Sequence, residues 1–310
     1  MNVLMNRLRG LELLDPVESG GLQVFGLRWS GDAPLEYLTL DDALEAKVLT
    51  VTEVNEGGSV PTLLVNNESD QMVFLMAGEQ LIGAKQNRVL NASIMVKPRS
   101  KLVVPVSCVE RGRWGYRSRP FSSSGSASHG TLRRMMSRQA HQGYRAHRTP
   151  SSQQGQVWCQ ISEKLGQLGS VSPSDALEQV YEDHRERLET VTREVRVPDD
   201  CNGVVFAVGG RVAGVDLFDN PKTLSKLLPK LVRAYAIDAI AVKDAKNIDR
   251  DAVTAWLETA PSANAETYDS PGLGSDVRLE SKQVAGAALV VDDRPVHVEL
   301  FPVDSSEHKA

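Results

Sequence analysis

The stretch from residue 72 to residue 114 constrains this chain more than any other. Short apolar runs typical of strands alternate in it with dense polar clusters at 78–80, 85–88 and 107–110. Structural demands alone rarely place so many ligand-binding or reactive side chains at the ends of short strands, where the functional loops of β-rich proteins lie. We therefore expect the functional site in this stretch.

The same stretch predicts that the first part of the chain is rich in β-structure. Residues 88–96 alternate as a strand does, and an apolar run resumes over 102–109. Residues 48–54 and 60–65 are further β-branched runs. Pro105 predicts an edge strand or a bulge, because proline cannot donate a hydrogen bond to a strand ladder. So many short strands separated by turns indicate a sandwich or a barrel-like half.

Helical patterns and further strands fill the second half. Apolar stripes at helical spacing run through 157–168, 177–195 and 224–235. Residues 204–218 predict a β-hairpin around a Gly-Gly pair, and strand-like runs follow within 285–301. The sequence thus predicts an α+β fold. Its N-terminal β-rich half, a sandwich or barrel-like, is followed by helices, a hairpin and C-terminal strands that pack with it.

Charge is distributed unevenly along the chain. The net charge is −5, yet residues 111–162 contain nine arginines, no lysine and no acidic residue, so the remainder carries −14. This average argues against a nucleic-acid binder as a whole and indicates an acidic body with a basic segment. Because 115–152 is rich in Ser, Gly and Arg, we expect it to be a mobile segment. It would separate a β-rich region 1–114, which carries the site, from an α+β region 153–304.

Cellular location and metals are constrained by what the sequence lacks. Cys108, Cys159 and Cys201 are odd in number and show no paired or metal-type spacing, which suits a reducing cytoplasm. No secretory signal and no membrane-length apolar run is present, so we expect a cytoplasmic protein without membrane contact. The histidines form no metal-ligand pairs, so no metal site is predicted. A Mg²⁺ ion held by carboxylates and a substrate phosphate leaves little signature and stays an alternative.

Three side chains are candidates for catalysis. Glu79 and Glu110 are expected to act as acid and base if their environments differ. The alternative for Glu79 is a structural ion pair with Lys85 at a strand end. Cys108 shares a strand face with Glu110 and is a candidate nucleophile, with an inert buried thiol as the alternative.

Long polar side chains beside these candidates predict the binding of an anion. Four consecutive polar residues are costly to bury without a partner, and arginine binds a phosphate with two parallel hydrogen bonds. A tryptophan next to an arginine is able to stack on a base, although a core position is equally compatible. The predicted ligand-binding residues are Lys85, Gln86, Asn87, Arg88, Arg113 and Trp114.

Several of these motifs together resemble one uncharacterised prokaryotic family, the ARG-and-rhodanese-phosphatase-superfamily-associated protein domain, in which ARG stands for ADP-ribosylglycohydrolase. The resemblance covers nearly the whole chain, with alanine at position 84 where many relatives have glycine. It is carried by 78–79, 83–88, 105–110, 112–114, 154–158, 209–218 and 228–231. The family is named for its association with ADP-ribose-processing and phosphatase-like proteins, and this implies a nucleotide-like or ADP-ribose-like ligand.

Two hypotheses follow, from different classes of protein. In the first, the chain is an enzyme that acts on a nucleotide-like small molecule through the carboxylate pair and the Lys/Gln/Arg cluster. In the second, it is a non-catalytic ligand-sensing or adaptor module. The arginine segment Arg117–Arg148 would then bind an acidic protein or RNA, and the alternative for this segment is a solvated linker.

Overall fold

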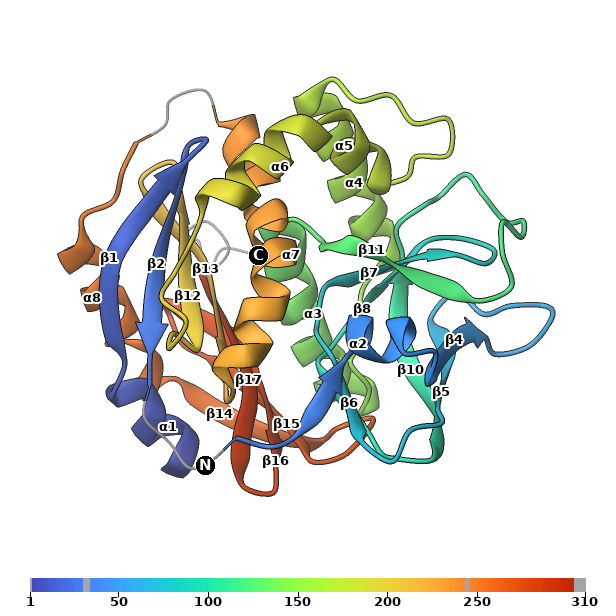
Figure 1. Ribbon diagram of the computed structural model, residues 1–310, viewed down its shortest axis with the longest axis horizontal. Coiled ribbons are helices and arrows are strands. Elements are labelled where there is room, and N and C mark those ends of the chain that lie inside the picture. The colour runs from blue at the N-terminus through green and yellow to red at the C-terminus, as the bar shows by residue number, and fades with distance from the viewer. Residues whose placement is uncertain (1, 30–33, 243–245, 304–310) are drawn as a thin grey trace. The chain divides into compact units, whose positions relative to one another are not determined.

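The computed structural model describes residues 2–29, 34–242 and 246–303 and has the α+β architecture that the sequence predicts (Figure 1). Contacts divide the chain into two compact units. Unit 1 is Met1–Leu35, Glu189–Asp269 and Gly274–Ala310; unit 2 is Glu36–Leu188 and Ser270–Leu273. This division does not coincide with the expected regions 1–114, 115–152 and 153–304. The reason is that strands from both ends of the chain pair in unit 1.

Unit 1 is built on one antiparallel sheet with the strand order β1-β2-β12-β13-β17-β16-β15-β14. Its strands are β1 (Glu12–Ser19), β2 (Leu22–Arg28), β12 (Gly203–Val208), β13 (Arg211–Phe218), β14 (Asn264–Asp269), β15 (Ser275–Glu280), β16 (Val284–Val291) and β17 (Arg294–Pro302). Its helical segments are α1 (Asn2–Arg9), α7 (Pro221–Ala241), α8 (Arg250–Leu257) and η1 (Ala260–Ser262). Helix α6 (Arg185–Glu194) begins in unit 2 and ends in unit 1.

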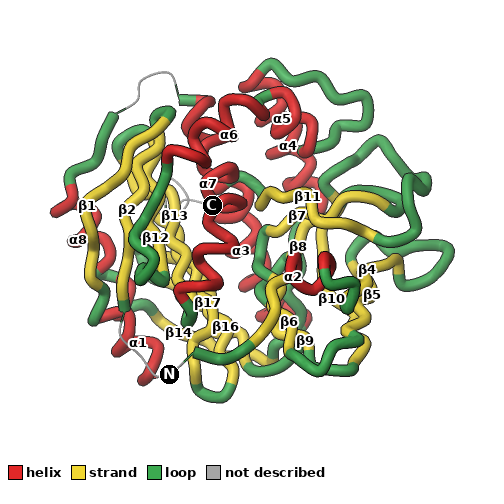
Figure 2. The backbone as a smooth tube through the Cα atoms, in the orientation of Figure 1, coloured by secondary structure: helices red, strands yellow, loops and turns green. Residues whose placement is uncertain are grey.

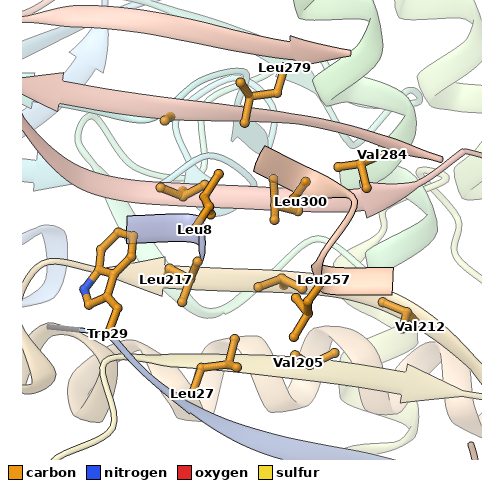
Figure 3. Close-up of a cluster of buried hydrophobic side chains, with 14 of the residues drawn as sticks. Leu8, Leu27, Trp29, Val205, Val212, Leu217, Leu257, Leu279, Val284 and Leu300 are labelled. Carbon is orange, nitrogen blue, oxygen red and sulfur yellow. The ribbon is translucent and has the colours of Figure 1, made fainter. Parts of the chain in front are cut away.

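One face of this sheet carries the apolar core of unit 1 (Figure 3). Leu8 of α1 and Leu257 of α8 join Leu217 and Leu300 of the sheet in a single buried cluster. Each fully buried side chain of this size contributes about 1.5–3 kcal/mol. Because successive strand residues face opposite sides, α7 covers the other face, where its Tyr235 ring stacks on Phe206 with centroids 4.1 Å apart.

The predicted hairpin over 204–218 is confirmed as β12 and β13. Its turn residues Gly209 and Gly210 have φ angles of +60° and +76°. Positive φ at both central positions matches the twist of the flanking strands, and glycine adopts it without steric cost.

Unit 2 contains a curled sheet and a smaller one. The curled sheet has the order β11-β7-β8-β10-β5-β4, and the smaller sheet has the order β3-β6-β9. The strands are β3 (Tyr37–Thr39), β4 (Leu49–Glu53), β5 (Thr62–Asn67), β6 (Met72–Leu75), β7 (Glu79–Gly83), β8 (Arg88–Leu90), β9 (Ile94–Val96), β10 (Ser100–Cys108) and β11 (Phe121–Ala127). The helices are α2 (Leu40–Glu45), α3 (Gly130–His147), α4 (Gln154–Leu168) and α5 (Glu178–Asp183).

The curled sheet nearly closes on itself. A single bridge joins Thr52, in the edge strand β4, to Pro120, just before the opposite edge strand β11. The concave space is filled by an apolar cluster that includes Val51, Leu81 and Val104, all buried. This confirms the barrel-like character predicted for the N-terminal half.

Pro105 lies neither in an edge strand nor at a bulge, contrary to the prediction. It marks the point where β10 changes partner, because Ser100–Pro105 pairs with β5 and Val106–Cys108 pairs with β8 on the other side. At such a change, a residue without an N–H removes no bond that the ladder needs.

The alternating strand expected over 88–96 is divided into β8 and β9. Both faces of these strands are buried, so the alternation of apolar and polar residues does not correspond to one buried and one exposed face. Between β8 and β9, side-chain hydrogen bonds take the place of the backbone bonds of a strand ladder. Ser93 accepts a hydrogen bond from the amide of Ala77 at 2.9 Å, and Asn91 donates to the carbonyl of Pro150 at 3.2 Å.

The prediction of a mobile segment over 115–152 is wrong for most of its length. Figure 2 shows β11 followed by the long helix α3 in this part of the chain. The serines of β11 pair with β7, and α3 buries an apolar stripe that includes Leu132, Met136 and Tyr144. The composition of this segment predicted mobility wrongly, because small polar residues are also compatible with a strand that forms backbone hydrogen bonds with a neighbouring strand.

Among the described residues, no helix is both long and apolar enough to cross a bilayer.

Candidate ligand-binding site

Three loops meet at one end of the curled sheet and form the candidate site. They are the β4–β5 loop (54–61), the β7–β8 turn (84–87) and the β10–β11 loop (109–120). The Nζ atom of Lys85 donates to the carbonyl of Gly57 at 2.7 Å, and the amide of Gly115 donates to the carbonyl of Lys85 at 3.2 Å. The β7–β8 turn is therefore tied to both neighbouring loops.

Glu110 is the centre of these connections and is completely buried. Its Oε2 accepts from Nη2 of Arg113 at 2.6 Å and from the amide of Asn87 at 3.1 Å. Its Oε1 accepts from the Ser174 hydroxyl at 2.9 Å and lies 3.6 Å from Nη2 of Arg117. Burial alone raises the pKa of Glu110, but the hydrogen bonds outweigh it and bring the pKa below its ordinary value. Glu110 is thus an ionised, fully engaged carboxylate at neutral pH.

Arg113 connects Glu110 to the β7–β8 turn. Its Nη1 donates to the carbonyls of Ala84 at 2.6 Å and Gly115 at 2.8 Å. Its Nη2 also donates to the carbonyl of Gly83 at 3.2 Å and to Oδ1 of Asn87 at 3.1 Å. A planar guanidinium with several fixed donors suits this task. Arg113 and Asn87 are therefore occupied in shaping the loops, which an external anion would disturb.

The loops display two aromatic rings around one lysine. Nζ of Lys85 lies 5.2 Å from the ring centroid of Trp114 and 5.2 Å from that of Tyr116. The residues Trp114 and Tyr116 are 50% and 49% exposed, which is unusual for large aromatic residues. Accessible aromatic rings beside positive charges are also found in grooves that bind single-stranded nucleic acids, where bases stack on the rings.

Arg88 and Gln86 lie deeper, below this surface. Arg88 is fully buried, and its Nη1 donates to Oε1 of Gln86 at 3.1 Å. Burial lowers the pKa of Arg88 from its ordinary value, although a guanidinium keeps its charge. Nη2 of Arg88 lies 3.8 Å from Oε1 of Glu53, and Cζ of Arg88 lies 5.8 Å from the Trp114 ring centroid. Glu53 is not among the residues predicted from the sequence. Its only signal is an acidic residue at the buried end of a β-branched run.

Cys108 has the environment of an inert thiol. It is completely buried, and burial raises the pKa of its thiol. Its backbone is held by the side chain of Gln154, which donates to the Cys108 carbonyl and accepts from the Cys108 amide, both at 2.8 Å. These features favour the structural alternative for Cys108.

Glu79 lies apart from Glu110. It begins β7, and its Oε2 accepts from the amide of Met76 at 2.8 Å. In the β7–β8 register Leu81 faces Arg88, so the Asn87 amide that binds Glu110 lies near the other end of β7. With a rise of ~3.3 Å per residue, about 10 Å along the strand separate the two positions. The structure does not bring the predicted acid–base pair together.

Unit 1 contains buried pairs of polar side chains of its own. Nε2 of His297 lies 3.1 Å from Oδ1 of Asp216, and the His297 ring stacks on Phe218 with centroids 4.8 Å apart. In the same sheet, Nη2 of Arg278 donates to Oδ2 of Asp276 at 2.6 Å. Polar residues at alternate positions of otherwise apolar strands are the only sequence signal for these pairs. In the described part of the chain, no group of three or more His, Cys, Asp and Glu side chains is arranged to hold a metal ion.

Comparison with known proteins adds a family but no annotated relative. The model of the ARG and Rhodanese-Phosphatase-superfamily-associated Protein domain matches residues 10–301. No curated protein and no solved structure matches the chain. The match covers nearly the full length, as the motifs of the loop region had indicated. The chain therefore belongs to the ARG and Rhodanese-Phosphatase-superfamily-associated Protein domain family.

Proposed function

We propose that the protein binds small anionic ligands that carry a planar ring, of the nucleotide or ADP-ribose kind. The observation that supports this proposal is the position of Lys85 between the half-exposed rings of Trp114 and Tyr116. The lysine supplies a positive charge for a phosphate, and the rings supply surfaces on which a base stacks. Arg117, largely exposed beside them, adds a second cation.

The chemistry of the loops favours binding over catalysis. Glu110 is ionised and engaged by Arg113, Asn87 and Ser174, so it has no proton to donate at neutral pH. Cys108 is a buried thiol with a raised pKa. Glu110 and Cys108, two of the three predicted catalytic groups, thus have structural partners, whereas the accessible groups are those suited to holding a ligand. The family name associates such domains with ADP-ribose processing, and this adds a lead by association.

A thermal-shift series with ADP-ribose, adenosine 5′-monophosphate and ribose 5-phosphate tests the proposal. At a ligand concentration 100 times Kd, binding stabilises the fold by about 2.7 kcal/mol. We expect Lys85→Ala and Trp114→Ala to abolish the shift. Lys101→Ala removes the same charge from an exposed position of β10 and should leave the shift unchanged. A shift that survives Lys85→Ala and Trp114→Ala would refute the proposed location.

The enzyme hypothesis, with Glu79, Glu110 and Cys108 as catalytic groups, is tested in the same samples. Any ligand that binds is incubated with the protein, with and without Mg²⁺, and the products are separated by chromatography. Turnover that is lost in Glu110→Gln while binding is retained would establish catalysis and overturn the binding-only interpretation.

Binding of RNA or an acidic protein through Arg117–Arg148 stays a prediction. The segment is not one exposed basic arm, because Arg133 in α3 is 2% exposed while Arg117 and Arg145 are exposed. Charge reversal at Arg117 and Arg145, followed by titration with labelled RNA in low salt, would measure this contribution.

A further inference from the structure

Two buried charged side chains beneath Trp114 use only part of their hydrogen-bonding capacity. Arg88 is fully buried, and its Nε and Nη2 atoms have no hydrogen-bond partner among the described residues. The same is true of Oε2 of Glu53. At 3.8 Å, Nη2 of Arg88 and Oε1 of Glu53 are within ion-pair range but beyond a hydrogen bond. Two donors and one acceptor are therefore adjacent in a buried place.

Such groups are exceptional in a folded protein and call for an explanation. Nearly all buried polar atoms have a partner, because an unmade hydrogen bond leaves the cost of desolvation uncompensated. Other atoms of the same two residues are engaged, since Oε1 of Glu53 accepts from the amide of Lys85 at 3.3 Å. The unused atoms are thus fixed in place by their own side chains, which is the preorganisation that a binding site needs.

Trp114 lies near this pair and is itself half-exposed. Its ring is 5.8 Å from the Arg88 guanidinium carbon, and the residue is 50% exposed. Gly58 allows the β4–β5 loop to approach closely. A Cβ atom at Gly58 would lie 3.2 Å from Cζ2 of Trp114 and 3.3 Å from Oε2 of Glu53. Half-exposed side chains on loops change rotamer without movement of the underlying sheet.

We propose that Arg88 and Glu53 form a subsite for the edge of a planar heterocycle that presents an acceptor atom beside an N–H donor. The amino-pyrimidine edge of adenine has this pattern. Its ring nitrogen accepts a hydrogen bond from Nε or Nη2 of Arg88, and its amino group donates to Oε2 of Glu53. Trp114 turns outward and stacks on the ring. A phosphate is excluded from this subsite because Glu53 repels it, and it stays near Lys85.

This subsite rests on the proposed function, and two analogues separate the two ideas. Purine riboside 5′-monophosphate keeps the ring, sugar and phosphate of adenosine 5′-monophosphate but lacks the amino group. Ribose 5-phosphate lacks the purine ring. In isothermal titration calorimetry we expect adenosine 5′-monophosphate to bind at least about 10-fold more tightly than purine riboside 5′-monophosphate, because the analogue leaves Glu53 unpaired. Ribose 5-phosphate should bind more weakly than both.

Each outcome decides one of the two ideas. Equal affinities for the two ring-bearing nucleotides, both above that of ribose 5-phosphate, would overturn the subsite and leave the proposed function intact. No binding of any of the three, or equal binding of all three, would overturn the proposed function as well. These measurements use the wild-type chain and do not depend on the folding of a variant.

A protein variant provides the matched control. Glu53→Gln keeps the shape of the side chain and removes the charge that strengthens the bond to the amino group. We expect it to weaken adenosine 5′-monophosphate binding toward the affinity of purine riboside 5′-monophosphate, which it should leave unchanged. An equal loss for both nucleotides would show that Glu53 acts only on the fold and would overturn its assignment.

Discussion

Replacement of Glu110 by glutamine tests whether the three loops depend on a buried carboxylate. Glutamine is able to keep the hydrogen-bond geometry. The side-chain oxygen of the glutamine would accept from Arg113 and from the backbone amide of Asn87. Its side-chain amide NH2 would donate to the hydroxyl oxygen of Ser174. What it removes is the charge. A hydrogen bond to a charged group contributes about 1.5–3 kcal/mol and a neutral one about 0.5–1.5 kcal/mol, so the contacts to Asn87 and Ser174 each lose roughly 1 kcal/mol. The contact to Arg113 keeps a charged donor but loses the ion pair, which costs roughly 1 kcal/mol or more.

Three contacts give an expected loss of about 3 kcal/mol in the free energy of unfolding. This agrees with the roughly 3–5 kcal/mol that breaking a buried ion pair costs. Urea denaturation followed by tryptophan fluorescence measures the loss. Glu45→Gln, at an exposed position, removes the same charge and should change stability by less than about 0.5 kcal/mol.

The pH dependence of this difference has a definite sign. Because the folded-state pKa of Glu110 is depressed, its contribution is fully present above the unfolded pKa of about 4.3. It is lost only as pH falls through the lower folded pKa. The wild type should therefore exceed Glu110→Gln by a constant amount between pH 6 and 8. A difference that disappears on going from pH 8 to pH 6 would mean that Glu110 takes up a proton near neutrality, and it would refute this account.

Further predictions concern the same loops. Gly83→Ala should destabilise the fold by about 2 kcal/mol, because φ is +122° and the new Cβ would lie 2.5 Å from a serine oxygen. Gly115→Ala is the control: its new Cβ would have no atom within 4 Å, so it should have little effect in the same denaturation assay. Arg113→Lys should cost about 2 kcal/mol in that assay, since an ammonium cannot reproduce the fork of hydrogen bonds, and a loss below about 0.5 kcal/mol would contradict its structural role. A thiol reagent such as dithionitrobenzoate should modify the exposed Cys159 rapidly and the buried Cys108 only on unfolding; rapid labelling of Cys108, identified by mass spectrometry, would restore it as a candidate nucleophile.

The backbone at Ala84 illustrates how a sequence departure acquires a meaning in the structure. The resemblance implies glycine at this position; the chain has alanine there, with a φ angle of +38°, in the left-handed region that glycine favours. The turn keeps this conformation because the Ala84 carbonyl accepts from both Nη1 of Arg113 and the amide of Arg117. The neighbouring residues thus impose a conformation that the residue itself disfavours.

The features that were predicted correctly from the sequence are those that depend on neighbouring residues in the chain. The α+β class, the β12–β13 hairpin and the apolar helix stripes depend on periodicity and on glycine, which act within a few residues. The sequence also singled out the polar clusters at strand ends, because long polar side chains are costly to bury without partners; that they form a functional site stays a prediction. Family membership was carried by the same clusters.

The roles within the site were decided by tertiary structure. Glu79 and Glu110 look alike in the sequence, but the register of β7 separates them and the partners of Glu110 fix its charge. Glu53 carried almost no signal, because its closeness to Arg88 results from the curl of a sheet that brings distant strands together. A segment that composition alone suggests is mobile becomes β11 and α3, since β7 offers its serines a pairing edge. Pairing between distant strands is not encoded in any local window, and it therefore determined which polar residues became buried structural groups and which stayed exposed to solvent.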